Sequence, residues 1–243
     1  LIVAAITFIF GFLAAKIPTS LNKYKLRQFF GSDFFTENIN IVYGVFQRIK
    51  DNQQIKEAVY EKVYSDGTRY EVFPPPFLLT GTDGVRGVAH FLQEFTKFRK
   101  KPFIVTTDKE ALSNMHSHTF ICVGGSIANE LSKYALAQDS NKSLRFSLPS
   151  EKRGYATIVS VRGNEKFWRG NEIGHDFGII VKIRNQLSSE RRYFFVCAGI
   201  GSLGTSAALW YLSTYWEELY KEFGSNEFGI VVEVNNDKDN ITK

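Results

Sequence analysis

Two glycine-containing segments, each at the end of an apolar run, carry the clearest chemical pattern in this sequence. The second reads AGIGSLGT at residues 198–205, and its glycines fit G-x-G-x-x-G between a predicted strand and a predicted helix. In that context the backbone can approach a phosphate closely, and the first helical turn offers it free N–H groups. The pattern therefore predicts that a phosphorylated ligand contacts Gly199, Gly201, Ser202, Gly204 and Thr205.

The first segment reads FICVGGSIANE at residues 120–130. Two glycines after a strand allow a tight turn, and Ser126 can cap a helix from about residue 126 to 136. The free N–H groups of such a helix form an anion-binding end. We expect ligand contacts from Gly124, Gly125, Ser126 and Asn129, although a helix start without a ligand also fits.

Three further polar residues are candidates for the same ligand. Residues 81–87 read GTDGVRG, where Arg86 can pair with a phosphate and Asp83 either joins it or caps a helix. Asp176 begins a DFG triplet, but the HRD motif and strand lysine of a kinase are missing, so Asp176 either forms a turn or lines the pocket.

The sequence lacks a recognisable catalytic or metal-binding set. An NAD site would place an acidic residue about 20 residues after its glycines, whereas the candidate Glu233 comes later. His116 and His118 have no nearby cysteine or carboxylate to complete a metal site. No paired catalytic carboxylates or P-loop lysine occur, so we expect no catalytic residues, no metal and no cofactor.

Charge and cysteine content restrict the partners. The net charge is +5, but its clusters are short, so we expect no direct binding of duplex nucleic acid. Only the basic residues Lys23, Lys25 and Arg27, directly after the N-terminal apolar run, have an evident partner, the membrane surface. The two cysteines lie in apolar runs, which favours a reducing compartment.

The N-terminal segment LIVAAITFIFGFLAA has no charged residue. As a helix it rises about 22 Å, less than the hydrocarbon core of about 30 Å, so we expect further apolar residues before Leu1. The basic flank places the rest of the chain in the cytoplasm, which predicts a single-pass protein of the inner (cytoplasmic) membrane. A signal peptide and a buried core helix are the alternatives.

The remaining pattern predicts an α/β fold: a Rossmann-like, mainly parallel sheet with an antiparallel insertion at 155–183. A helix from about residue 82 to 98 should bury Val85, Val88, Ala89, Leu92 and Phe95. A long helix should cover 205–223. The expected organisation is a transmembrane helix at 1–17, a basic neck at 18–37, a cytosolic ligand-binding domain at 38–234 and a disordered polar tail at 235–243.

At its two glycine loops the chain resembles the Rossmann-like, SLOG-type sensor domains of bacterial nucleotide-signalling and antiviral defence systems. The resemblance implies a domain fused to an effector, of which a transmembrane helix is one class. Catalytic relatives carry P-G-G-x-G-T-x-x-E. Here Gly204-Thr205 is present, but the Pro-Gly-Gly start is absent and Ala208 replaces the glutamate, which favours binding over hydrolysis.

These features together predict a membrane-anchored effector that senses a nucleotide-derived second messenger. A single span cannot form a pore, so a membrane-permeabilising or channel-like output requires a homo-oligomer in contact with membrane lipid. The alternative is a membrane-tethered nucleotide or NAD hydrolase that uses the same pocket, with Asp83 or Asp176 as acid or base.

Overall fold

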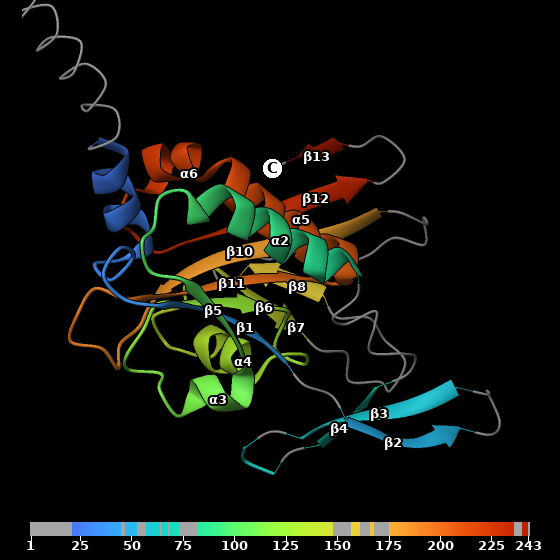
Figure 1. Ribbon diagram of the computed structural model, residues 1–243. Coiled ribbons are helices and arrows are strands. Elements are labelled where there is room, and N and C mark those ends of the chain that lie inside the picture. The colour runs from blue at the N-terminus through green and yellow to red at the C-terminus, as the bar shows by residue number, and fades with distance from the viewer. Residues whose placement is uncertain are drawn as a thin grey trace, which may run out of the picture.

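The computed structural model describes residues 21–44, 47–52, 57–63, 65–67, 69–72, 82–147, 157–160, 166–167, 175–235 and 240–242. These residues form a layered α/β fold, as the sequence predicts (Figure 1). The predicted transmembrane segment at 1–17 lies outside the described residues. Within the described ranges, every helix is too short or too polar to cross a membrane.

A seven-stranded sheet forms the centre of the described structure. The order across the sheet is β13 (Asn240–Thr242), β12 (Phe228–Asn235), β10 (His175–Arg184), β11 (Tyr193–Gly199), β6 (Phe120–Val123), β1 (Ile39–Tyr43) and β5 (Phe103–Thr107). The strands β11, β6, β1 and β5 are parallel neighbours. The strand β10 runs antiparallel to both β11 and β12, so β12 points the same way as the parallel four.

Two small antiparallel sheets accompany the main sheet. One consists of β2 (Gln47–Asn52), β3 (Glu57–Val63) and β4 (Arg69–Val72). The other consists of β7 (Leu144–Ser147), β8 (Thr157–Ser160) and β9 (Lys166–Phe167). The antiparallel insertion predicted at 155–183 is therefore confirmed in β8 and β9, and β10 adds an antiparallel strand to the main sheet.

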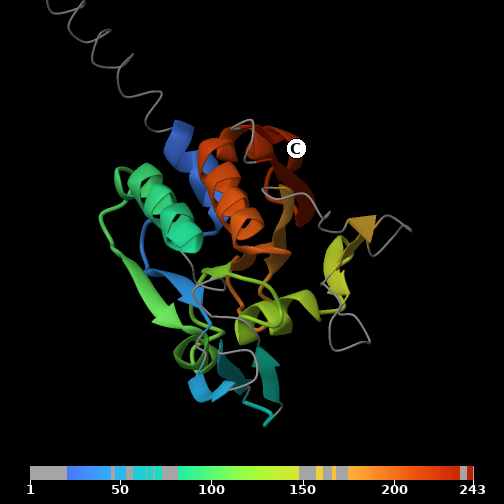
Figure 2. The same cartoon turned by 90° about the vertical axis from the view of Figure 1, so that its right-hand side faces the viewer.

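Helices cover both faces of the main sheet (Figures 1 and 2). On one face lie α2 (Thr82–Thr96), α5 (Ser202–Thr214), α6 (Trp216–Phe223) and the helical residues 21–30. On the other lie α3 (Asp108–Leu112) and α4 (Glu130–Leu136). Each face of the sheet packs against its helices in a separate apolar core, and successive strand side chains point into alternate cores. In β11, Phe195 and Cys197 lie in the core beside α5, and Phe194 and Val196 lie in the core beside α4.

The segment expected to be a basic neck belongs to the domain from residue 21 onward. The side chains of Leu26, Phe29 and Phe30 are 0% exposed because the helix packs its apolar stripe against the sheet. Beyond the helix, the buried carboxylate of Asp33 accepts hydrogen bonds from the backbone N–H and hydroxyl of Thr119, both at 2.8 Å. Burial raises the pKa of Asp33, while these hydrogen bonds lower it.

The buried face of α2 agrees only in part with the predicted one, since Phe95 is buried and Val88 and Leu92 pack against the core. Phe91 and Phe95 are buried, but Val85 is 64% exposed. The reason is Gly87: a Cβ atom there would lie 3.1 Å from the Ser206 Cα of α5, so the missing side chain lets the helices approach closely. Gly87 therefore faces α5, while Val85 and Ala89 of the aliphatic stripe face solvent.

Two predictions about the C-terminal part were wrong. The helix expected at 205–223 is two helices, since α5 ends at Thr214 and α6 starts at Trp216 after a break at Tyr215. The tail, predicted to be disordered, contains β13, which pairs with β12. Three residues, 240–242, are too few for a polar–apolar alternation to indicate a strand. Only the pairing with β12 identifies β13 as one.

Lys182 of β10 is a buried cation in an aromatic cage. Its side chain is 0% exposed, and its Nζ lies 4.8 Å from the ring centroid of Phe29 and 4.3 Å from that of Tyr193. The Nζ also donates to the Gly224 carbonyl at 3.4 Å. Burial lowers the pKa of Lys182 to about 7, with the charge of Arg191 also lowering it and that of Glu227 raising it.

The two glycines of α2 provide a matched pair of substitutions. Gly87→Ala should lower the free energy of unfolding by about 1–3 kcal/mol, because the added methyl group meets the backbone of α5. Gly84→Ala should raise it by up to about 1 kcal/mol, because a Cβ there meets nothing within 4 Å and alanine favours the helix. Urea unfolding measures both, and equal effects would contradict this account of the crossing.

The depressed pKa of Lys182 predicts a pH-dependent stability. Between pH about 7 and 10.5 the unfolded chain binds a proton that the native state does not, so stability rises with pH in that range. Lys182→Met should therefore stabilise the fold by a larger margin at pH 7 than at pH 10. Urea unfolding at both pH values checks this, with exposed Lys142→Met as the control. A margin independent of pH would refute the assignment.

Candidate functional site

The loops that carry the glycine motifs meet at one edge of the main sheet. The strands β1, β6 and β11 are parallel neighbours, with Tyr43 beside Val123 and Val123 beside Cys197. The chain leaves these strands at Gly44, Gly124 and Gly199. The two glycine loops therefore lie side by side at the carboxyl edge of the parallel strands, which is where α/β proteins bind ligands.

The second glycine loop already holds a carboxylate of its own chain. The side chain of Asp176 on β10, 2% exposed, accepts hydrogen bonds from the backbone N–H of Gly201 at 3.0 Å and of Gly204 at 2.7 Å. It also accepts from the N–H of Phe177 at 2.9 Å. Asp176 therefore occupies the position at the start of α5 where the motif predicts a phosphate.

The rest of this loop is also bonded internally. The Thr205 hydroxyl accepts from the Gly199 N–H at 2.8 Å and donates to the Gly201 carbonyl at 3.2 Å. A Cβ atom at Gly204 would lie 2.3 Å from the carbonyl oxygen of Phe177, so this glycine allows α5 to rest directly on β10. These glycines serve close packing between a helix and a strand.

The first glycine loop is packed rather than open. Gly124 has a φ of +95°, and a Cβ atom at Gly125 would lie 3.1 Å from the Phe146 ring of β7. The helix starts later than predicted: the N-cap of α4 is Asn129, not Ser126, because its side chain accepts from the Ser132 N–H. The same amide donates to the carbonyls of Val42 at 2.9 Å and Val123 at 3.2 Å.

A second buried carboxylate, which the sequence did not reveal, lies at the start of α4. Asp108 is 0% exposed, and its Oδ2 accepts from the Glu130 N–H at 2.8 Å. The carboxylate of Glu130 accepts from the N–H of Ser65 at 2.7 Å and from its hydroxyl. Asp108 directly follows the strand β5 and is the first residue of α3. An acidic residue at this junction was the sequence feature that could have indicated a buried carboxylate.

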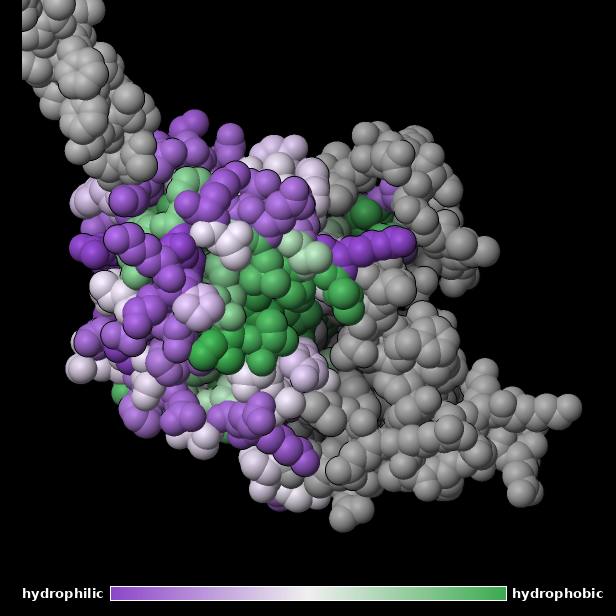
Figure 3. Space-filling view, in the orientation of Figure 1, coloured by the Kyte–Doolittle hydropathy of each residue, from purple (hydrophilic) through white to green (hydrophobic). Residues whose placement is uncertain are grey.

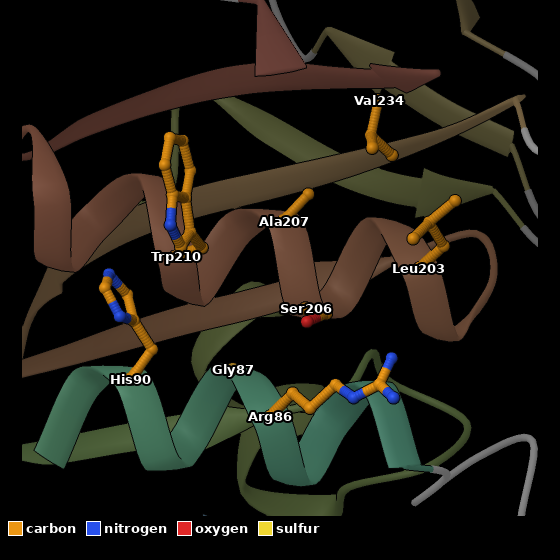
Figure 4. Close-up of a pocket in the computed structure, with 8 residues that line it drawn as sticks. All are labelled: Arg86, Gly87, His90, Leu203, Ser206, Ala207, Trp210 and Val234. Atoms are coloured by element: carbon orange, nitrogen blue, oxygen red, sulfur yellow. The ribbon is translucent and has the colours of Figure 1, made fainter. Parts of the chain in front are cut away.

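A groove of about 280 Å³ runs over the outer face of α5, between α2 and β12 (Figure 4). Trp210 and His90 lie together at one end, with nearly parallel rings whose centroids are 6.1 Å apart. Arg86 extends from α2 towards the Leu203 end. The full lining is Arg86, Gly87, His90, Leu203, Ser206, Ala207, Trp210 and Val234. The groove is mostly apolar, with a guanidinium at one end and an aromatic pair at the other.

The structure separates the predicted site residues into groups. Asp176, Gly201, Gly204 and Thr205 lie together but bond to one another. Asn129 is buried in a structural role, and Arg86 alone of the predicted residues lines the groove. The side chain of Asp83 lies outside the described structure. Sequence reasoning missed Ser206 and Trp210 because their i, i+4 spacing on α5 is typical of ordinary core packing. It missed His90 because a lone histidine on α2 carries no pattern that indicates a ligand.

Cysteine and metal chemistry receive no support from the described residues. Cys122 and Cys197 are 0% exposed, and burial raises the pKa of both thiols. Among the described residues, no three histidine, cysteine or acidic side chains gather as a metal site would require.

The capping role of Asp176 predicts a stability effect. Asp176→Ala leaves the N–H groups of Gly201 and Gly204 without their acceptor, which should lower the free energy of unfolding by roughly 2–4 kcal/mol. Asp176→Asn retains one acceptor oxygen and should lose less. Urea unfolding measures the series, with exposed Asp139→Ala as the control. Equal, small losses for Asp176→Ala and Asp139→Ala would show that the carboxylate is not needed there.

The chain matches no protein-family model, no curated protein and no solved structure.

Proposed function

We propose that this domain binds a nucleotide-derived signal in the groove between α2 and α5, and that the chain is a membrane-anchored sensor. The supporting observation is the combination, in one groove, of Arg86, the Trp210–His90 pair and an apolar floor. An α/β sheet with three loops at its carboxyl edge also supports a Rossmann-like classification.

Each part of the groove suits one part of a nucleotide. A guanidinium recognises phosphate through paired N–H donors, which assigns the phosphate to Arg86. Trp210 and His90 offer nearly parallel rings, against which a base can stack. Leu203, Ala207 and Val234 keep water away from the ligand. Pockets for drug-sized ligands measure about 300–1,000 Å³, so a groove of about 280 Å³ fits about one mononucleotide unit.

In this proposal the glycine loops position the groove. Asp176 already fills the amide cradle at the start of α5, and a phosphate there would face its carboxylate. The ligand instead meets α5 through side chains one turn further along. This arrangement favours a binding protein over the alternative hydrolase, because Asp176 is buried and bonded to three backbone N–H groups.

The proposed output requires coupling between the ligand and the packing of the helices. The groove draws its lining from α2, α5 and β12, so a bound ligand contacts all three at once. A ligand shifts an equilibrium only through contacts that differ between two states, and contacts across packed helices meet that condition. The segment at 1–17 is proposed as the anchor in the inner membrane, and a homo-oligomer as the species that acts on it.

Two substitutions test the groove. Calorimetry of the full chain against a panel of mononucleotides and cyclic oligonucleotides should identify a ligand. Arg86→Ala should weaken its binding about tenfold or more, because it removes a charged phosphate contact, and should leave the matching nucleoside unaffected. Trp210→Leu should weaken both, because the base loses its stacking surface.

The control is Arg145→Ala, which removes an exposed arginine of β7 outside the groove. It should leave the dissociation constant unchanged. Binding that Arg86→Ala and Arg145→Ala weaken equally would place the ligand elsewhere. A panel in which nothing binds the folded chain would remove the proposal.

A further inference from the structure

The strand β5 forms one edge of the main sheet. Among the described strands it pairs only with β1, so the other side of its backbone has no strand partner there. Its sequence, FIVTT, contains none of the lysines, prolines or bulges that commonly protect an edge. Ile104 is 39% exposed and Val105 is 54% exposed. An apolar edge of this kind is suited to pairing with another strand.

The helix beside this edge is also apolar on its outer side. The inward turn of Gly87 leaves Val85 64% exposed, and Ala89 one turn later is exposed as well. Figure 3 shows hydrophobic side chains gathered where α2 and β5 lie in Figure 1. The apolar surface therefore spans two layers of the fold, a strand edge and the neighbouring helix. We call it the α2–β5 face, defined by Val85, Ala89 and Val105. Ile104 points to the opposite face of the sheet, because successive side chains of a strand alternate.

We propose that the α2–β5 face binds a second copy of this chain, with the two β5 strands pairing antiparallel about a two-fold axis. A second copy supplies both a strand edge and an apolar helix face in the matching geometry. A lone peptide strand would leave the helix uncovered. A membrane surface would leave the N–H and C=O groups of β5 unpaired.

The charges at the ends of β5 agree with antiparallel pairing. Lys100 and Lys101 come shortly before the strand, and Glu110 follows it. Antiparallel strands bring the basic end of one copy beside the acidic end of the other, and the reverse at the far end. Lys109 offsets part of this attraction, so the apolar contacts and the strand pairing provide most of the affinity. The inference stands independently of the ligand proposed for the groove.

Sedimentation equilibrium of the full chain tests the interface. The wild type should be a dimer, and Val105→Lys should raise its dissociation constant at least tenfold by placing a charge in the strand pair. Leu187→Lys is the matched control, since Leu187 is also exposed, at 49%, but lies in the turn between β10 and β11. It should leave the dimer intact.

A cysteine variant tests the geometry without disturbing the surface. Val105 is the middle residue of β5, so Val105→Cys should give a disulfide-linked dimer under mild oxidation, whereas Leu187→Cys should not. Both native cysteines are buried and provide no background. A monomeric wild type, an equal loss with Leu187→Lys, or a dimer that Val105→Cys fails to cross-link would overturn the proposal. Lipid vesicles that bind the monomer through Val105 would assign the face to a membrane instead.

Discussion

The contact between Asp176 and the first turn of α5 determines much of the structure around it. The carboxylate fixes the start of a helix that packs against β10, β11, β12 and α2, and whose outer side chains floor the groove. Gly204 completes the contact, since only a residue without a side chain lets the helix rest on the Phe177 carbonyl. A buried carboxylate with paired N–H donors is stable where an unpaired one would not be. The position of the groove therefore depends on this one cap.

The same solution occurs at the start of α4, where Asp108 accepts from the Glu130 N–H. Helix starts at the carboxyl edge of a parallel sheet present positive partial charge. In many proteins an anionic ligand satisfies that charge, whereas here a carboxylate of the chain does so at both helices. A glycine-rich loop at a sheet edge can thus hold either an anionic ligand or a carboxylate of its own chain. Which of the two it holds depends on whether the neighbouring strand carries an acidic residue. Asp176 lies on a strand 25 residues before Gly201, so the loop sequence alone does not show it.

Sequence patterns predicted the positions of strands better than they predicted which side of a helix is buried. The apolar runs before the two glycine segments form β6 and β11 as predicted, because strand composition and glycine ends are local properties. The predicted buried face of α2 was right for Phe95 but wrong for Val85 and Ala89, because periodicity ranks valine above glycine while Gly87 faces α5 for steric reasons. The groove was missed for a related reason. Trp210, His90 and Arg86 come from two helices more than a hundred residues apart, and only tertiary packing brings them together.

The close crossing of α2 and α5 at Gly87 also places α2 between two separate surfaces. Arg86 and His90 of α2 line the groove, while Val85 and Ala89 of the same helix belong to the α2–β5 face. A helix of 15 residues moves largely as one body, so a displacement of α2 that widens the groove also changes the α2–β5 face offered to a second copy. Such a shared wall makes the two equilibria thermodynamically linked. If a ligand raises the association constant of two copies by some factor, association raises the affinity for that ligand by the same factor.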